Sequence, residues 1–176
     1  MPNAEAYIPL SYHLSRDLWP VDFLPVGHSF VATGGSVEGN GGIFNGSVVA
    51  GNSAGGVTVN VIVGPSKKQP TTLSVLDDLT LQPTSNLFVP IIGNTAGSGF
   101  GQIDVTGTAN LNEGTLTIGR PKTFVPAIGS AFPVLTASGS LSGTFGTVNG
   151  TSINSSEHFQ VGYDEHDVTI TVVSGP

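Results

Sequence analysis

The chain has 176 residues, enough for one domain, and its 25 Gly and 12 Pro favour turns over long helices. Charged residues make up only 10% and mean hydropathy is +0.20, so the composition is not that of a disordered acidic tail. The net charge of −7 argues against nucleic acid, the absence of cysteine excludes disulfides and thiolate metal sites, and no apolar run could span a bilayer.

Residues 1–30 differ from the rest, because they hold the only Trp and two of the three Tyr. Pro20 and Pro25 prevent a long helix, and apolar residues alternate along 8–14 as in a strand. We expect an aromatic-rich N-terminal arm or cap, which could add itself as a strand to another subunit. The residues expected to carry this self-assembly are Tyr7, Ile8, Leu10, Tyr12, Leu14, Leu18 and Trp19.

From residue 31 onward the sequence predicts short β-strands separated by Gly, Asn and Ser turns. Apolar residues alternate with polar ones, the pattern of strands with one buried face. No window of 11 or more residues has the period of a helix with caps. The predicted strands include 57–63, 73–75, 79–81, 87–89, 103–105, 116–118 and 168–172.

An internal repeat of about 30 residues underlies these strands. Six apolar residues recur at offsets of 30 or 29, which suggests that successive units stack and bury a shared apolar stripe. The pairs are Leu73 and Ile103, Val75 and Val105, Leu79 and Ala109, Leu81 and Leu111, Leu87 and Leu116, and Val89 and Ile118. We therefore expect an all-β fold, a β-solenoid of the parallel β-helix kind, in residues 31–176; a β-sandwich or jelly roll is the alternative.

The repeat ends near residue 126, so we expect 126–176 to form an atypical C-terminal cap. Its last part has the pattern of a β-hairpin, in which an acidic turn, 164–167, joins a strand at 159–163 to a strand at 168–173. Such a terminal unit covers strand edges that a stack of repeats would otherwise leave open.

The run from Gly99 to Leu111 resembles the strand-turn-strand unit that closes many bacterial cell-surface proteins. Together with 114–118, 126–137, 142–145 and 167–172, it is similar to the C-terminal repeat region of autotransporter-type surface β-solenoid proteins, over roughly residues 70–173. This resemblance implies an extracellular place and a structural or adhesive role. Residues 1–30 have no counterpart in that family.

No motif predicts catalysis. Residues 51–55 match the Gly-x-Ser-x-Gly nucleophile elbow, but a β-branched strand pattern follows where the elbow needs a helix. Acidic turns at 77–78 and 164–167 leave a Ca²⁺ site as an alternative to solvated turns, although their spacing matches no known calcium loop. The four His have no spacing typical of zinc, and no pair of acids is singled out for glycoside hydrolysis.

The sequence thus predicts a non-enzymatic extracellular module of a bacterial surface protein, without a cofactor. Richness in Gly, Ser, Thr and Asn and the absence of cysteine fit that location. We expect a homo-oligomer or fibre, assembled end to end through the N-terminal arm, and contact with a glycan or a host surface. A carbohydrate-binding or polysaccharide-cleaving β domain is the alternative function.

Overall fold

In the computed structural model, residues 69–175 are described continuously. Before them, seven short strands are described, at 6–8, 29–32, 35–38, 43–44, 47–50, 57–60 and 62–63. Every regular element in these ranges is a β-strand, and the longest has eight residues, Asp167–Ser174. The prediction of an all-β chain is confirmed for this part of the protein.

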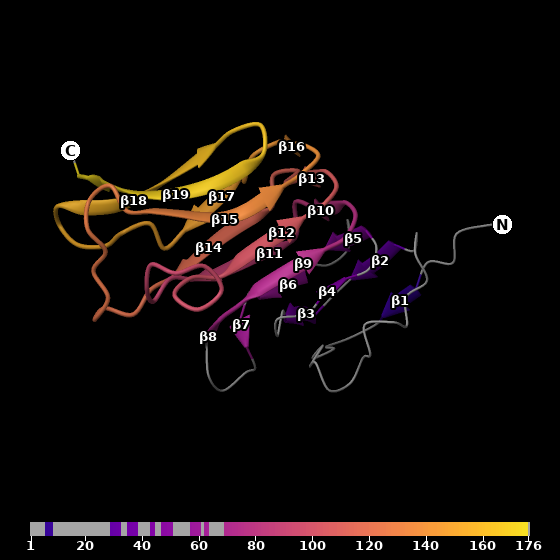
Figure 1. Cartoon of the computed structure of the whole chain (residues 1–176), viewed down its shortest axis with the longest axis horizontal. Helices are drawn as coiled ribbons and strands as arrows, with labels where there is room; N and C mark the ends of the chain where they lie inside the picture. Colours follow the sequence, from indigo (N-terminus) through magenta and orange to yellow (C-terminus); the bar gives the residue numbers. More distant parts are fainter. Residues whose placement is uncertain are drawn as a thin grey trace.

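Three sheets of stacked strands form the fold, and β7 (Ile62–Val63) and β8 (Gln69–Pro70) add a small antiparallel pair (Figure 1). Sheet A contains β1 (Ala6–Ile8), β2 (Ser29–Ala32), β5 (Ser47–Ala50), β10 (Leu79–Leu81), β13 (Ala109–Asn110) and β16 (Leu141–Ser142). Sheet B contains β3 (Gly35–Glu38), β6 (Val57–Asn60), β11 (Asn86–Pro90), β14 (Thr115–Gly119) and β17 (Thr147–Asn149). Sheet C contains β4 (Ile43–Phe44), β9 (Thr72–Val75), β12 (Gln102–Val105), β15 (Ala131–Ala137), β19 (Asp167–Ser174) and β18 (Glu157–Tyr163).

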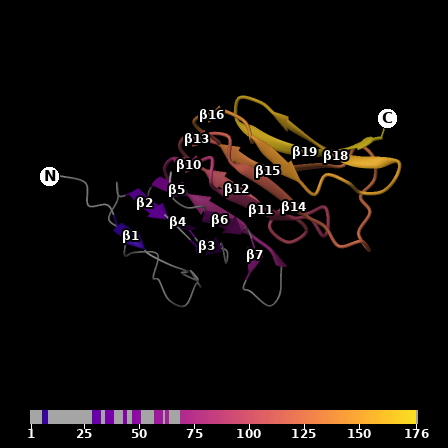
Figure 2. The same ribbon diagram turned by 180° about the vertical axis from the view of Figure 1, so that it is seen from behind.

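The chain visits the three sheets in the same order each time, A, then B, then C. We call one such pass a rung. The passes are β2–β3–β4, β5–β6–β9, β10–β11–β12 and β13–β14–β15, and a last pass begins with β16 and β17. Each strand pairs in parallel with the strand of the next rung in its own sheet, and the strands stack obliquely across the molecule (Figure 2). The arrangement is solenoid-like, and parallel pairing does not fit the antiparallel sheets of a sandwich or jelly roll.

The observed register confirms the predicted repeat. Leu73 and Val75 pair directly with Ile103 and Val105, Leu79 pairs with Ala109, and Leu87 and Val89 pair with Leu116 and Ile118. The sixth predicted pair, Leu81 and Leu111, comes directly after the paired residues of β10 and β13, and both side chains are completely buried. The recurring apolar residues are therefore stacked one above another, as the offset of about 30 residues predicts.

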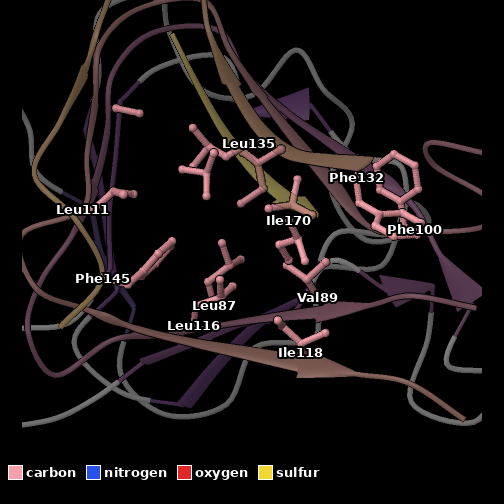
Figure 3. Packing of buried hydrophobic residues seen from close by; sticks show 14 of the residues in the cluster. Leu87, Val89, Phe100, Leu111, Leu116, Ile118, Phe132, Leu135, Phe145 and Ile170 are labelled. Atoms are coloured by element: carbon pink, nitrogen blue, oxygen red, sulfur yellow. The ribbon is translucent and has the colours of Figure 1, made fainter. Parts of the chain in front are cut away.

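The buried side chains fill the space between the three sheets. In β9, β12 and β14 every second residue is buried, while the residues between them are only half-buried. Figure 3 shows Leu87 and Leu116 of sheet B and Leu135 of sheet C converging on this interior. A stack of this kind hides one face of each strand from water, which is the main source of its stability.

The C-terminal end departs from the parallel pattern. β19 pairs antiparallel with β15, and β18 pairs antiparallel with β19 along its whole length. The predicted C-terminal hairpin is confirmed, and four residues, 164–167, separate its last pair, Tyr163 and Val168.

The N-terminal arm is described only in part. β1 lies within residues 1–30 and pairs in parallel with β2 of the same chain. β2 begins at Ser29, so the first rung starts before the expected boundary at residue 31.

Candidate interaction surfaces

The connections between strands differ sharply in length around the solenoid-like stack. After residue 72, the connections from sheet C to sheet A have three residues (76–78, 106–108 and 138–140), and those from A to B have four (82–85, 111–114 and 143–146). The earlier connections 33–34, 45–46 and 51–56 have two, two and six residues. From sheet B to sheet C the first connection, 39–42, has four residues, the next three have 11 (61–71, 91–101 and 120–130), and the last, 150–156, has seven. The described long connections, 91–101, 120–130 and 150–156, lie along one edge, which we call the loop edge (Figure 1). Insertions gathered on one side of a repeat array often mark its binding side.

The connection 91–101 is held firmly by its own backbone. The Thr95 carbonyl accepts hydrogen bonds from the amides of Gly99, at 2.6 Å, and Phe100, at 3.0 Å. Phe100 is buried and packs edge-on against Phe132 of β15, with ring centroids 5.4 Å apart. This loop is thus fixed to the core rather than only joined at its two ends.

Arg120 anchors the next connection, 120–130. Its guanidinium donates to the carbonyls of Pro121, at 3.1 Å, of Phe124, and of Ile153, at 2.8 Å, while its Nε is buried without a partner. It therefore ties the connections 120–130 and 150–156 together.

Apolar side chains are exposed on this same connection. Val125 is 55% exposed and Ile128 is 58% exposed, and Lys122 is exposed beside them. Within the described range 69–175, the only lysine or arginine residues are Arg120 and Lys122, whereas eight residues are acidic. The positively charged lysine and arginine side chains of this range therefore lie on the loop edge.

The C-terminal hairpin packs across the end of the stack. The carbonyls of Glu165 and His166 accept hydrogen bonds from the amides of Leu141, at 2.8 Å, and Ala137, at 2.7 Å. The hydroxyl of Tyr163 accepts one from the amide of Phe145, at 3.3 Å, and the two rings lie 6.4 Å apart. Burial of the ring raises the pKa of the Tyr163 phenol.

The acidic turn of this hairpin is organised by one carboxylate. Asp164 Oδ1 accepts hydrogen bonds from the amides of His166 and Asp167, both at 2.8 Å. These bonds favour the ionised form and hold the pKa of Asp164 below its ordinary value.

The other acidic turn also uses a carboxylate for its own structure. Asp78 Oδ1 accepts a hydrogen bond from the amide of Thr108 in the next rung, at 2.7 Å. Within the described residues, no three His, Cys, Asp or Glu side chains gather as they would around a metal ion. The acidic turns considered for Ca²⁺ lie far apart in the chain, and the carboxylates of Asp78 and Asp164 bind backbone amides.

Two of the predicted self-assembly residues, Tyr7 and Ile8, lie in β1, where they pair with Val31 and Ala32 of the same chain. The other five, Leu10, Tyr12, Leu14, Leu18 and Trp19, lie outside the described residues. The Gly-x-Ser-x-Gly run 51–55 also lies outside them. It separates β5 from β6, so the next described element is a strand and not the helix that a nucleophile elbow needs.

Analysis of the sequence alone missed the loop edge. The signal was present, because 11 residues lie between the strands of sheets B and C in three successive repeats. The offsets of the apolar residues alone do not show the lengths of the connections.

Sequence comparisons with known protein families and with curated proteins find no match for this chain. None of the described residues belongs to a helix long and apolar enough to cross a membrane.

Proposed function

We propose that the chain is a β-solenoid of the parallel β-helix kind that serves as an extracellular structural and adhesive module of a bacterial surface protein. In this proposal, copies join end to end through the N-terminal arm into a fibre or layer, and the C-terminal hairpin acts as a cap. The repeated order of the three sheets and the in-register stacking of their strands support the solenoid. The absence of cysteine and the abundance of Gly, Ser, Thr and Asn are typical of exported bacterial proteins.

One observation carries the self-assembly part of the proposal. β1, which lies in the predicted arm, is the terminal strand of sheet A. A terminal strand presents backbone donors and acceptors on its outer side, and an extended segment of a second copy can pair with them. Strand addition at this end requires no new fold, because the stack already grows by the same pairing.

The adhesive part of the proposal rests on the loop edge. Its connections are anchored by Phe100 and Arg120, so they can present side chains in fixed positions. Val125 and Ile128 offer apolar contacts there, and Lys122 offers a positive charge. A rigid loop loses less conformational entropy on binding than a flexible one.

Self-assembly is tested by removing residues 1–28, which deletes β1 and leaves β2 complete. We expect the full chain to form species larger than a monomer in light scattering and the truncated chain to remain monomeric. Ile8→Lys provides a second variant that keeps the whole chain, since a charge on an edge strand opposes strand addition.

Ile128→Lys is the matched control, because it adds the same charge to an exposed position on the loop edge. It should leave the mass unchanged. A monomeric full-length chain, or a truncated chain that still associates, would contradict assembly through the arm.

A further inference from the structure

The strands of sheet C run between two different edges of the molecule. β12 and β15 begin at the connections 91–101 and 120–130 of the loop edge, and they end at the short corners 106–108 and 138–140 that lead to sheet A. These corners are stacked, since the amide of Gly139 donates to the carbonyl of Gly107, at 3.0 Å. The loop edge and the column of corners therefore lie at opposite ends of the same strands (Figure 1).

The turn of the C-terminal hairpin extends this column of corners. The carbonyl of Glu165 accepts a hydrogen bond from the amide of Leu141 in sheet A, and the carbonyl of His166 accepts one from the amide of Ala137, the last residue of β15 in sheet C. The turn thus lies where sheets C and A meet. We call this side of the molecule the acidic edge, and it comprises 76–78, 106–108, 138–140 and 164–167.

Charged side chains are divided between the two edges. The acidic edge holds five of the eight acidic residues of 69–175 and neither of the lysine and arginine residues of that range. The three described connections of the loop edge hold Arg120 and Lys122 and no acidic residue, although Glu157 directly follows the last of them. The five residues of the acidic edge are Asp77, Asp78, Asp164, Glu165 and Asp167.

Exposed apolar side chains follow the same division. Leu76, on the acidic edge, is 45% exposed and directly precedes the two aspartates of its corner. Val125 and Ile128, on the loop edge, are exposed on the connection that carries Lys122. Each edge thus combines apolar contact area with charge, and the two charges are of opposite sign. Surfaces of this kind are complementary to one another.

One molecule cannot bring its own two edges together, because they lie at opposite ends of the same strands. A second copy in the same orientation can place its acidic edge beside the loop edge of the first. We infer that copies of this chain associate side by side in this way. The contact joins two different surfaces, so it repeats from copy to copy without closing. This inference rests on the proposed end-to-end assembly, and it names the contact that joins fibres into a layer.

A single contact of this kind is weak, because exposed ion pairs contribute little to binding. Two isolated copies are therefore not held together by it, and the chain without residues 1–28 should still remain monomeric. In a fibre the same contact recurs with every copy. Its many weak contributions act together and hold neighbouring fibres side by side.

Negative-stain electron microscopy of the assembled full-length chain tests this contact. Wild-type fibres should lie side by side in layers at about 0.01 M salt, where the screening length is about 30 Å. They should separate at about 1 M salt, where that length falls to about 3 Å. The fibres should not shorten, because strand pairing and not charge joins the copies along them.

Substitutions at Lys122 test the loop edge, where this side chain is exposed. Lys122→Glu reverses the charge, and its fibres should remain single at low salt. Lys122→Arg is the matched control, because it keeps the charge and should keep the layers. Ile128→Lys adds to the positive charge of the same edge and should leave both fibres and layers in place.

Substitution of Glu165 tests the acidic edge. Glu165→Lys lowers the negative charge of that edge, so its layers should separate at a lower salt concentration than those of the wild type. Glu113→Lys is the control, because it makes the same exchange at an exposed position in the corner 111–114 between sheets A and B. Its layers should separate at the wild-type salt concentration.

Three results would contradict these expectations, and they can be told apart. Layers that persist in Lys122→Glu and at about 1 M salt would mean that the fibres associate through another surface, which overturns the inference. Wild-type fibres that stay single at every salt concentration would also overturn it and leave end-to-end assembly intact. A full-length chain that forms no fibres would refute the proposed self-assembly, and the layer with it.

Discussion

At the scale of single residues, the three-residue corners between sheets C and A depend on glycine. Gly107 lies directly between Asp77 of the rung before it and Gly139 of the rung after it. Its amide donates to the Asp77 carbonyl, at 3.1 Å, and its carbonyl accepts from the Gly139 amide, at 3.0 Å. A Cβ at position 107 would lie 2.8 Å from the carbonyl carbon of Asp77 and would meet the Asp78 carboxylate. The corner has no room for a side chain there.

Gly107→Ala should therefore destabilise the protein by about 1–3 kcal/mol, as overpacking a tightly packed site does. The new methyl group would also push Asp78 away from the Thr108 amide that it binds. Chemical denaturation, followed by circular dichroism, measures the change.

The matched control is Gly162→Ala on β18, where an added Cβ would meet only the Thr169 carbonyl, at an ordinary 3.6 Å. Its effect should stay within about 0.5 kcal/mol. Equal stability of the two variants would mean that the corner can relax around a methyl group.

Sequence reasoning identified the apolar residues of the core but did not predict the backbone conformation or the close contacts at the corners. Leu73 and Ile103 could be placed because burial imposes a strict period of two and the repeat imposes their spacing. In the turn 112–114, glycine is the residue type that adopts a positive φ at the least cost. The positive φ values are instead at Asn112 and Glu113, while Gly114 is needed because a Cβ would lie 2.9 Å from Ser85 Oγ. Only the neighbouring rung reveals that contact.

At the scale of elements, the C-terminal hairpin depends on a turn in which the Asp164 carboxylate accepts hydrogen bonds from two backbone amides. The two amides that bind its carboxylate hold the pKa below the ordinary value of about 3.9 for an aspartate. A carboxylate with a lowered pKa in the folded state contributes stability above the pKa of the unfolded chain. That contribution is lost as pH falls through the folded-state value.

We therefore predict that the melting temperature of the protein falls more steeply below about pH 4 than that of Asp164→Asn. Asparagine keeps an oxygen that accepts the same hydrogen bonds but does not titrate. The difference in melting temperature between the two proteins, measured from about pH 6 to about pH 2, isolates the effect of Asp164 from that of the other acids. Parallel curves over the whole range would show that ionisation of Asp164 does not support the turn.

Strands and the hairpin were predictable at this scale, because alternation of apolar and polar residues marks both. β15 shows where the rule weakens. Val134 and Leu135 are both buried although they are neighbours, because the register with β19 shifts between Pro133 and Leu135. A bulge of this kind allows two successive side chains to face the interior, and a pattern of period two cannot show it.

At the scale of the whole molecule, one continuous core runs through the rungs. Ile103 lies at its centre, completely buried and paired with Leu73 on one side and Leu135 on the other. Since each rung touches only its neighbours, a defect in a middle rung weakens the contacts to both of them.

Ile103→Ala should cost about 2–5 kcal/mol of unfolding free energy, the usual result of a cavity in a packed core. Ile128→Ala makes the same chemical change at a position that is 58% exposed, and should cost less than about 0.5 kcal/mol. Denaturant titration of both variants gives the comparison. If they lose similar stability, position 103 does not belong to a tightly packed interior.

The stacking of rungs was predictable from the sequence, because two aligned repeats already impose it. The way in which the C-terminal hairpin is fixed to the stack was not. It depends on backbone hydrogen bonds, such as the one from the Leu141 amide to the Glu165 carbonyl, and these bonds join segments that share no sequence pattern. Of the seven residues predicted to carry self-assembly, the structure places Tyr7 and Ile8 on a terminal strand, and assembly through them stays a prediction.

Within residues 72–146, the equal lengths of equivalent corners make this architecture modular. A segment of about 30 residues, taken from one corner to the equivalent corner of the next pass, carries a complete set of strands and turns. Duplicating or excising that segment would change the length of the protein by about 4.8 Å per copy while leaving both termini as they are. Duplication or loss of whole repeats can therefore change the length of the protein in fixed steps without altering its N-terminal or C-terminal residues.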